Sequence, residues 1–328
     1  MKIAVFSTYQ YDRTFLSAAN TGHELSFFVI PLNEQTAELT KGFDAVCVFV
    51  NDHINAAVVD ILKANGVQLI VLRCAGFNNV DIRAATAANI PVVRVPAYSP
   101  QAVAEHAMAL ILTLNRKTHK AYNRIREGNF SLERLMGFDL YNKQVAVIGT
   151  GKIGKAFCHI VKGFGCHIKA FDVYPDAALK ELGVVYDTLE NTLKEADIIS
   201  LHCPLTDETR HVINQQTLGI IKQGAMLINT SRGGLVNTAD VIEALKNGKL
   251  GYLGLDVYEQ EEKLFFHDHS EDVIQDDMIT RLISFPNVLI TAHQGFFTKE
   301  AMAEIVHTTF ANIDMFILQK ELINRVAV

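Results

Sequence analysis

The stretch QVAVIGTGKIG at residues 144–154 decides the fold prediction, because it joins a strand-like apolar run to three regularly spaced glycines. Its first five residues predict a buried strand, and the helix-forming run GKAFCHIVKGFG (154–165) follows the turn. Gly149, Gly151 and Gly154 fit the spacing G-x-G-x-x-G. In such a turn the first glycine permits a tight bend, the second lets a pyrophosphate approach the backbone, and the third lets the helix pack closely on the strand.

An acidic residue at the end of the next strand-like run extends this pattern. The run HIKAFD (167–172) ends in Asp172, which lies 18 residues after Gly154. A carboxylate about 20 residues after the glycines binds the ribose hydroxyls of a dinucleotide, and its charge repels a 2′-phosphate. The pattern therefore predicts binding of NAD rather than NADP. A strand, turn and helix without any ligand is the alternative interpretation.

Strand-length apolar runs alternate with helix-length segments along the whole chain. Most of these runs are continuous rather than alternating, which suits strands covered on both faces. Strands that alternate with helices predict parallel βαβ units in open, doubly wound sheets. The expected strands are 2–7, 24–30, 45–50, 68–74, 91–95, 144–149, 167–172, 197–203, 225–230, 251–257 and 287–293.

Two further helices define the expected domain boundaries. The apolar run from Ala102 to Arg116 follows the start signal Ser99-Pro100 and separates five strands from six, so we interpret it as a linker. The tail 298–319 has apolar residues at helical spacing, and we expect it to return to the first domain. The patterns predict two α/β domains. A discontinuous first domain comprises 1–99 and 299–328, and an NAD-binding domain comprises 100–298.

The composition argues against several classes of protein. The chain has 328 residues, 49% hydrophobic and 20% charged, so it can bury a substantial core. Its 36 acidic and 30 basic residues give a net charge of −6, which argues against a nucleic-acid partner. We expect neither secretion nor a membrane partner, because no signal-peptide pattern opens the chain and its most apolar run, 107–114, is too short to cross a bilayer. Five cysteines without a C-x-x-C pair predict reduced, buried thiols in the cytoplasm.

Polar side chains follow three of the expected strands of the second domain, at the edge where open α/β sheets bind ligands. They are Arg232, the glutamates at 259, 261 and 262, and His293. An arginine fork binds a carboxylate, a histidine exchanges a proton near neutral pH, and a carboxylate beside a histidine favours the imidazolium. Beside a nicotinamide ring these groups predict reduction of a 2-keto acid. Hydride reaches the carbonyl carbon while the imidazolium protonates the oxygen.

Each of these residues also has an ordinary structural interpretation. Arg232 can be a solvated loop residue, the glutamates an acidic surface turn, and His293 a hydrogen-bonded core residue. His106 and His202 compete for the role of acid, and spacing alone does not choose among the histidines. The segment His267-Asp268-His269 is faintly metal-like, but the acidic residues beside it favour a solvated loop, and we expect no metal.

These residues occur together in segments that resemble the D-isomer-specific 2-hydroxyacid dehydrogenases, especially their NAD-dependent D-lactate dehydrogenase branch. The matching segments span almost the whole chain. They are LRCAGFNNVD (72–81), VRVPAYSPQAVAEHA (93–107), VIGTGKIG (147–154), SLHCPLT (200–206), NTSRGGLVNT (229–238), LGLDVYEQE (253–261) and NVLITAHQGFFT (287–298).

The resemblance implies two Rossmann-like doubly wound domains with a cleft between them. It makes the discontinuous domain of 1–99 and 299–328 the substrate domain.

The resemblance also implies an activity and a set of catalytic residues. The family's catalytic arginine, glutamate and histidine fall on Arg232, Glu261 and His293. The implied reaction is the reversible, NADH-dependent reduction of pyruvate to D-lactate by a homodimer or homotetramer. Two alternatives remain open. One is a dehydrogenase for bulkier 2-keto acids, and the other is an NAD-sensing binding protein such as a corepressor.

The resemblance also implies two sets of binding residues. The family's cofactor contacts, with the glycine turn, fall on Gly149, Gly151, Lys152, Ile153, Gly154, Asp172, Cys203, Pro204, Thr230, Ser231 and Asp256. The substrate contacts comprise the loop Cys74, Ala75, Gly76 and Phe77, whose N–H groups meet the carboxylate, together with Tyr98, Phe49 and Phe296. Tyr98 also approaches the carboxylate, whereas Phe49 and Phe296 shape the side-chain pocket.

Overall fold

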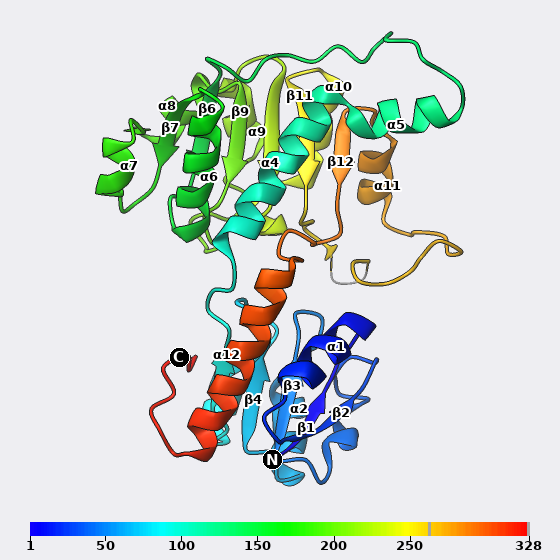
Figure 1. Cartoon of the computed structure of the whole chain (residues 1–328), viewed down its shortest axis with the longest axis vertical. Coiled ribbons are helices and arrows are strands. Elements are labelled where there is room, and N and C mark those ends of the chain that lie inside the picture. Colours follow the sequence, from blue (N-terminus) through cyan, green and yellow to red (C-terminus); the bar gives the residue numbers. More distant parts are fainter. Residues whose placement is uncertain (262–263, 327–328) are drawn as a thin grey trace. The chain divides into compact units, whose positions relative to one another are not determined.

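The computed structural model describes residues 1–261 and 264–326 and divides the chain into two compact units. The first unit is formed by Met1–Ser99 together with Phe297–Val328, and the second by Pro100–Phe296. Each unit is built on a parallel β-sheet with helices packed against it (Figure 1). The expected fold class, two parallel α/β domains, is therefore confirmed. None of the helices in the described ranges combines the length and apolarity that a membrane crossing needs.

The first unit has five parallel strands in the order β2-β1-β3-β4-β5. Its inner strands β3 and β4 are buried at every position, as expected for strands covered on both faces. The strands are β1 (Lys2–Val5), β2 (Glu24–Phe27), β3 (Ala45–Val48), β4 (Leu69–Leu72) and β5 (Val92–Arg94). The helices are α1 (Gln10–Ala19), η1 (Ala37–Thr40), α2 (Ala56–Ala64), α3 (Ile82–Ala87) and α12 (Lys299–Ile317).

The C-terminal segment completes the first unit. Val306, Phe310 and Ile313 of α12 pack in one core cluster with apolar residues of β1, β3 and β4. The residues after this helix lie along β5, where the N–H of Val326 donates to the carbonyl of Val92 at 2.8 Å. The tail therefore covers one face of the sheet and extends one of its edges.

The second unit has seven parallel strands in the order β12-β11-β10-β9-β6-β7-β8. They are β6 (Gln144–Ile148), β7 (His167–Phe171), β8 (Val185–Tyr186), β9 (Ile198–Leu201), β10 (Ala225–Asn229), β11 (Leu250–Leu255) and β12 (Val288–Ile290). β8 was not predicted, because this edge strand has only two residues, which pair with Lys169 and Ala170 of β7. The helices are α4 (Pro100–Arg116), α5 (Thr118–Arg126), α6 (Lys152–Gly163), α7 (Ala177–Glu181), α8 (Leu189–Lys194), α9 (Gln215–Ile220), η2 (Gly233–Leu235), α10 (Thr238–Lys246) and α11 (Asp277–Ser284).

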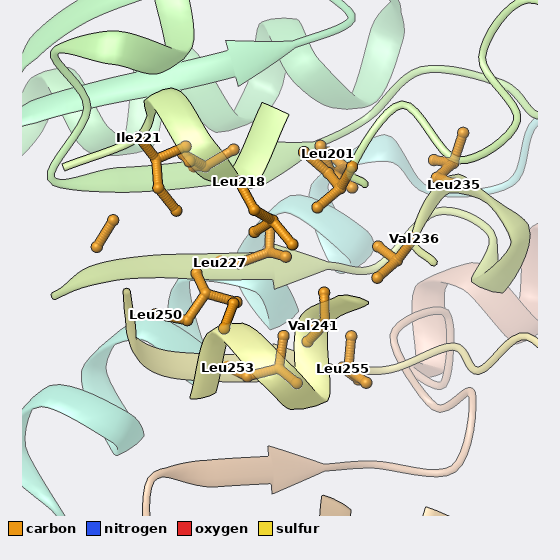
Figure 2. Close-up of a cluster of buried hydrophobic side chains, with 14 of the residues drawn as sticks. Leu201, Leu218, Ile221, Leu227, Leu235, Val236, Val241, Leu250, Leu253 and Leu255 are labelled. Carbon is orange, nitrogen blue, oxygen red and sulfur yellow. The ribbon is translucent and has the colours of Figure 1, made fainter. Parts of the chain in front are cut away.

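Two core clusters hold the second sheet between its helices. One contains Leu201, Leu227 and Leu253 from three neighbouring strands and packs against α9 and α10 (Figure 2). The other packs the apolar residues of α4 against β6 and α6. Gly254 makes room for this helix, because a Cβ there would lie 2.8 Å from Ile228 and 3.2 Å from Leu114 of α4. The apolar run at 107–114 therefore contributes mainly to the core of its own unit.

All five cysteines are buried and none is in a disulfide. Burial raises the pKa of the Cys47 and Cys203 thiols to about 11 and that of Cys158 to about 12. These thiols are therefore protonated near neutral pH and weak nucleophiles.

Candidate active site

The glycine turn between β6 and α6 leaves an open approach to the backbone. Gly149 has a φ of +94°, and a Cβ there would lie 2.5 Å from the backbone nitrogen of Cys203. A Cβ at Gly154 would lie 2.0 Å from the carbonyl oxygen of Gly149, so helix and turn are in close contact. A Cβ at Gly151 would meet nothing within 4 Å. Helix α6 begins at Lys152, followed by Ile153, and no side chain caps its N-terminus. The N–H groups at this helix start are arranged to receive a phosphate.

The carboxylate of Asp172 is fixed beside this turn. Its Oδ2 accepts from the N–H of Thr150 at 2.5 Å and from the Thr150 hydroxyl at 3.0 Å. Its Oδ1 accepts from the N–H of Tyr174 at 2.9 Å. Oδ2 thus accepts two hydrogen bonds and Oδ1 one, so Oδ1 retains acceptor capacity for a ribose hydroxyl. The turn and this acid together fit a dinucleotide.

The loops after β9 and β10 are tied to each other. Ser231 donates through its hydroxyl to the carbonyl of Cys203, which precedes Pro204, at 2.6 Å. Asn229, at the end of β10 and just before Thr230, accepts from the N–H of Ser231 and donates to the carbonyl of Arg232 at 2.8 Å. The predicted cofactor residues of these two loops therefore lie in one hydrogen-bonded structure.

The backbone at Gly233 holds the Arg232 loop against the segment that follows β11. A Cβ at Gly233 would lie 2.1 Å from the backbone carbonyl of Tyr258, so only glycine permits this approach. The guanidinium of Arg232 donates through Nη1 to the carbonyl of Ser231 at 2.7 Å. In the described part of the chain, the guanidinium makes this single hydrogen bond. Most of its N–H donors are therefore available to a ligand.

His293 and Glu261 form a hydrogen-bonded pair. Nδ1 of His293 lies 2.8 Å from Oε1 of Glu261, and the two side chains are 18% and 21% exposed. Glu261 is itself fixed, because its Oε2 accepts from the N–H of Tyr258 at 2.8 Å. Nε2 of His293 has no hydrogen-bond partner in the described parts of the chain. The pair therefore orients one ring nitrogen and leaves the other available for a substrate.

The neighbouring glutamate has a different partner. Oε1 of Glu259 lies 2.6 Å from Nε2 of His211, and its Oε2 accepts from the hydroxyl of Thr238 at 3.0 Å. Burial favours a higher pKa for Glu259, but the hydrogen bonds from His211 and Thr238 outweigh it and lower this pKa. Glu262 lies outside the described residues. The structure thus pairs Glu261, rather than Glu259, with His293.

The two other candidate histidines have structural partners. His202 is buried under the glycine turn, with Nε2 2.9 Å from the hydroxyl of Ser200 and its ring 4.8 Å from that of Phe157. Burial lowers the pKa of His202 to about 3, so it is neutral near pH 7 and unsuited to donate a proton. Nε2 of His106 lies 3.2 Å from Oδ1 of Asp256 and 3.0 Å from the hydroxyl of Thr291.

Asp256 holds the loop that carries His293. Its Oδ1 accepts from Thr291 at 2.6 Å and from the N–H of Gln294 at 2.9 Å, and its Oδ2 accepts from the N–H of Gly295 at 2.8 Å. Burial favours a higher pKa for Asp256, but hydrogen bonds from His106 and Thr291 outweigh it and lower this pKa. The carboxylate is therefore occupied by the chain itself, and its contact with the cofactor remains a prediction. This network helps to keep His293 at its left-handed φ of 53°.

Comparisons with known proteins identify the family of this chain. The family model described as D-isomer specific 2-hydroxyacid dehydrogenase, NAD binding domain, matches residues 108–295. A D-lactate dehydrogenase of Escherichia coli is 54% identical over 95% of this chain and 96% of its own. The chain belongs to the D-isomer-specific 2-hydroxyacid dehydrogenases. It is an oxidoreductase whose cofactor is NAD.

Two solved structures of the family resemble this dehydrogenase over almost its full length. The apo-structure of D-lactate dehydrogenase from Escherichia coli superposes with a TM-score of 0.92 at 49% identity, with 100% of both chains covered. The pyruvate reductase of Chlamydomonas reinhardtii superposes with a TM-score of 0.94 at 43% identity, with 99% of this chain and 98% of that chain covered.

Most of the predicted substrate residues of the dehydrogenase lie at one edge of the first sheet. Phe49 follows β3, the loop from Cys74 through Ala75 and Gly76 to Phe77 follows β4, and Tyr98 follows β5. Carboxyl ends of parallel strands share an edge, so these segments are neighbours within the first unit. Phe296 is a buried residue of the second unit. Their contacts with substrate remain predictions.

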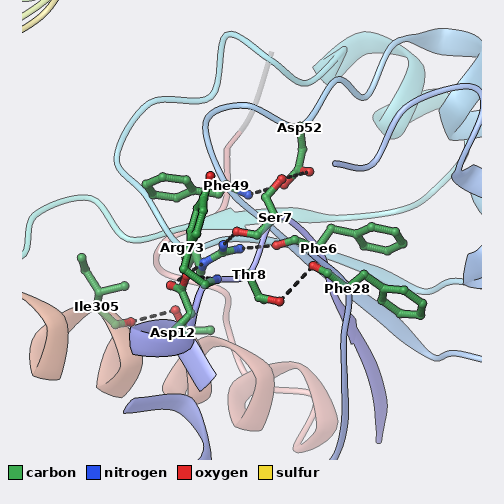
Figure 3. A network of polar contacts seen from close by, with 11 residues as sticks. Phe6, Ser7, Thr8, Asp12, Phe28, Phe49, Asp52, Arg73 and Ile305 are labelled. Carbon is green, nitrogen blue, oxygen red and sulfur yellow. Dashed lines mark hydrogen bonds and ion pairs between the residues drawn. The ribbon is translucent and has the colours of Figure 1, made fainter. Parts of the chain in front are cut away.

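A buried charge network supports this edge (Figure 3). Arg73 donates to the carbonyls of Phe6 and Ser7 at 3.0 and 2.7 Å, and its guanidinium carbon lies 4.9 Å from the ring centroid of Phe49. Asp52 accepts from the N–H of Phe49 at 2.5 Å and from the hydroxyl of Ser7 at 2.7 Å. The backbone and the ring of Phe49 are therefore held by two different buried charges.

Sequence reasoning missed the residues that position the others. Asn229, Thr291 and Arg73 were not among the candidates, and His106 was considered only as a possible acid. Asn229 and Arg73 carry a visible signal, since each is a polar residue at the end of a buried strand. The partnership of His106 with Asp256 has no local signal, because 150 residues separate the two.

Proposed function

We propose that this dehydrogenase reduces pyruvate to D-lactate with NADH, reversibly, and that Arg232, Glu261 and His293 are its catalytic residues. The observation that carries the proposal is the His293–Glu261 pair, 2.8 Å apart, on loops that follow strands of the NAD-binding sheet. A histidine oriented by a carboxylate through one nitrogen is built to transfer a proton at the other. NAD-dependent reduction of a keto acid requires such a proton donor.

Each catalytic side chain has a separate task in the proposed reaction. Arg232 binds the carboxylate of the keto acid through two parallel N–H groups and polarises the neighbouring carbonyl. His293 holds a proton at Nε2 and donates it to the carbonyl oxygen, while Glu261 stabilises the imidazolium through Nδ1. The bound NADH supplies the hydride that reaches the carbonyl carbon. Pyruvate, NADH and one proton thus give lactate and NAD⁺.

The choice of cofactor follows from Asp172. Its carboxylate is fixed at the glycine turn by Thr150, where it can accept hydrogen bonds from ribose hydroxyls. A 2′-phosphate would add negative charge beside this carboxylate, which disfavours NADPH. The remaining predicted cofactor residues lie on the turn and on the strand-end loops described above.

The preference for a small substrate is supported by the names of the relatives and by an aromatic residue of the first unit. The relatives include proteins named D-lactate dehydrogenase and pyruvate reductase. The family resemblance assigns Phe49, which follows β3, to the substrate's side-chain pocket, where its ring favours a small substituent. A dehydrogenase for bulkier keto acids is the alternative. We expect pyruvate to give the highest kcat/KM in NADH oxidation assays with pyruvate, 2-ketoisocaproate and phenylpyruvate, and a tenfold lower value for pyruvate than for the others would contradict the assignment.

We propose that the dehydrogenase is a cytoplasmic homodimer or homotetramer. Phe130, Leu132 and Met136, in the segment after α5, are 76%, 83% and 86% exposed, which is typical of an interaction surface. The five reduced cysteines agree with a cytoplasmic location. Sedimentation at micromolar concentration should give a mass above that of one chain, and a monomer would contradict this part of the proposal.

A further inference from the structure

We propose that the second unit contains a second anion site, a basic hollow that binds a small anion with two or more charged groups. The basic hollow is the cavity of about 550 Å³ beside α5, lined by Lys117, Lys120, Arg124 and Arg134. His119 and the apolar Leu114 and Tyr252 also line it. A cavity of this size lies in the range that holds small organic ligands, about 300–1,000 Å³.

The basic hollow concentrates positive charge without acidic partners. No carboxylate lines it, and none of its four cations forms an ion pair within the described residues. Three of them donate to backbone carbonyls instead. Lys117 donates to the carbonyl of Arg134 at 2.8 Å, Lys120 to that of Pro286, and Arg124 to that of Glu133 at 2.7 Å. In a chain of net charge −6, this uncompensated group of cations is a local exception.

The crowding of these cations favours an anionic ligand. Lys117 and Arg134 hold their places in the wall with left-handed φ angles of 51° and 64°, which are uncommon outside glycine. Burial, followed by the charges of Lys117 and Arg124, lowers the pKa of Lys120. An anion bound among these cations would relieve their mutual repulsion. Arginine binds a phosphate or carboxylate bidentately, and lysine acts as a point charge.

The basic hollow is separate from the cofactor site. Its wall includes Gly224, Gly251 and Asn287, which lie at the amino ends of β10, β11 and β12. The glycine turn and the loop of His293 lie at the opposite, carboxyl ends of the same sheet. Five residues of strand separate the two edges by about 17 Å. An anion in the basic hollow therefore does not occupy the phosphate position of NAD.

Isothermal titration calorimetry on the NADH-saturated protein tests this proposal, because NADH closes the cofactor site to added phosphate. Inorganic pyrophosphate and citrate serve as probes for phosphate and carboxylate ligands, with acetate at equal ionic strength as the monovalent control. We expect at least one probe to bind saturably, with one site per chain, and acetate to give no saturable signal. Absence of saturable binding by both probes would overturn the proposal.

Matched variants locate the binding. Lys120→Gln and Arg124→Gln should each weaken the affinity about tenfold or more, since each removes one charged contact. Arg124→Lys should retain more affinity than Arg124→Gln, which separates loss of charge from disturbance of the segment after α5. Lys63→Gln, on an exposed position of α2, should leave the affinity unchanged. Equal effects of the α5 variants and Lys63→Gln would overturn the assignment. So would loss of self-association in the α5 variants with unchanged probe affinity, because the hollow would then serve contact between copies.

Discussion

Replacing Glu261 by glutamine removes the charge beside His293 while keeping a group of nearly the same shape. The amide oxygen of glutamine can still accept from Nδ1 at the observed 2.8 Å, so orientation of the ring is retained. Reduction of a keto acid requires the imidazolium, and the carboxylate favours this form. In Glu261→Gln the neutral amide no longer stabilises the charge that the ring carries as proton donor, so kcat/KM for pyruvate reduction should fall.

The structure sets the size of this loss. A hydrogen bond to a charged group contributes about 1.5–3 kcal/mol, and removal of the charge alone loses part of that. Both side chains are about one-fifth exposed, which favours the low end of the range. A loss of about 1.5 kcal/mol in transition-state stabilisation corresponds to about a tenfold fall in kcat/KM.

Steady-state kinetics of pyruvate reduction at pH 7 measure this loss, and Glu259→Gln provides the matched control. Glu259 lies two residues away and has similar exposure, but its partner is His211 at 2.6 Å. We expect Glu259→Gln to keep the kcat/KM of the native enzyme. An unchanged kcat/KM in Glu261→Gln, or an equal loss in Glu259→Gln, would refute the role given to Glu261.

Three further predictions concern the substrate, the cofactor and stability. Arg232→Lys loses the bidentate fork, so the KM for pyruvate should rise about tenfold or more. An unchanged KM would contradict the role of Arg232 in binding the substrate carboxylate. Asp172→Ala should raise the KM for NADH and increase the ratio of NADPH to NADH activity, whereas an unchanged ratio would contradict the ribose contact. The pKa of His202 is lowered from 6.5 to about 3, so the unfolded chain binds a proton that the folded chain does not. The free energy of unfolding should therefore fall below pH 6.5, by about 1.4 kcal/mol per pH unit from this group. Urea titrations at pH 7, 5.5 and 4.5 should show a shallower fall in His202→Gln, and equal slopes would argue against a buried neutral His202.

Local patterns predicted the parts of the structure that depend on short segments. The turn at Gly149 needs a left-handed φ, and the helix beyond it must approach the turn closely. Glycine meets both demands, so the turn was visible in the sequence as a regular spacing of glycines. Asp172 was predictable as well, because it ends the strand-like run that follows this turn and its helix. The continuous apolar runs identified every strand except β8, whose two residues form no recognisable run.

Local sequence patterns did not predict which distant residues form pairs. Glu259 and Glu261 are two residues apart and chemically alike, and only the path of the chain after β11 gives one of them to His211 and the other to His293. Likewise, the partnership of Asp256 with His106 depends on the packing of α4 against the second sheet. Resemblance to a family supplied the choice of Glu261, which residue spacing had left open.

One measurement tests the central claim most directly. The purified enzyme is incubated with pyruvate and NADH, NADH oxidation is followed by absorbance, and the lactate is resolved by chiral chromatography. We predict one D-lactate for each NADH oxidised. Formation of L-lactate, or NADH that binds without being oxidised in the presence of pyruvate, would contradict the account.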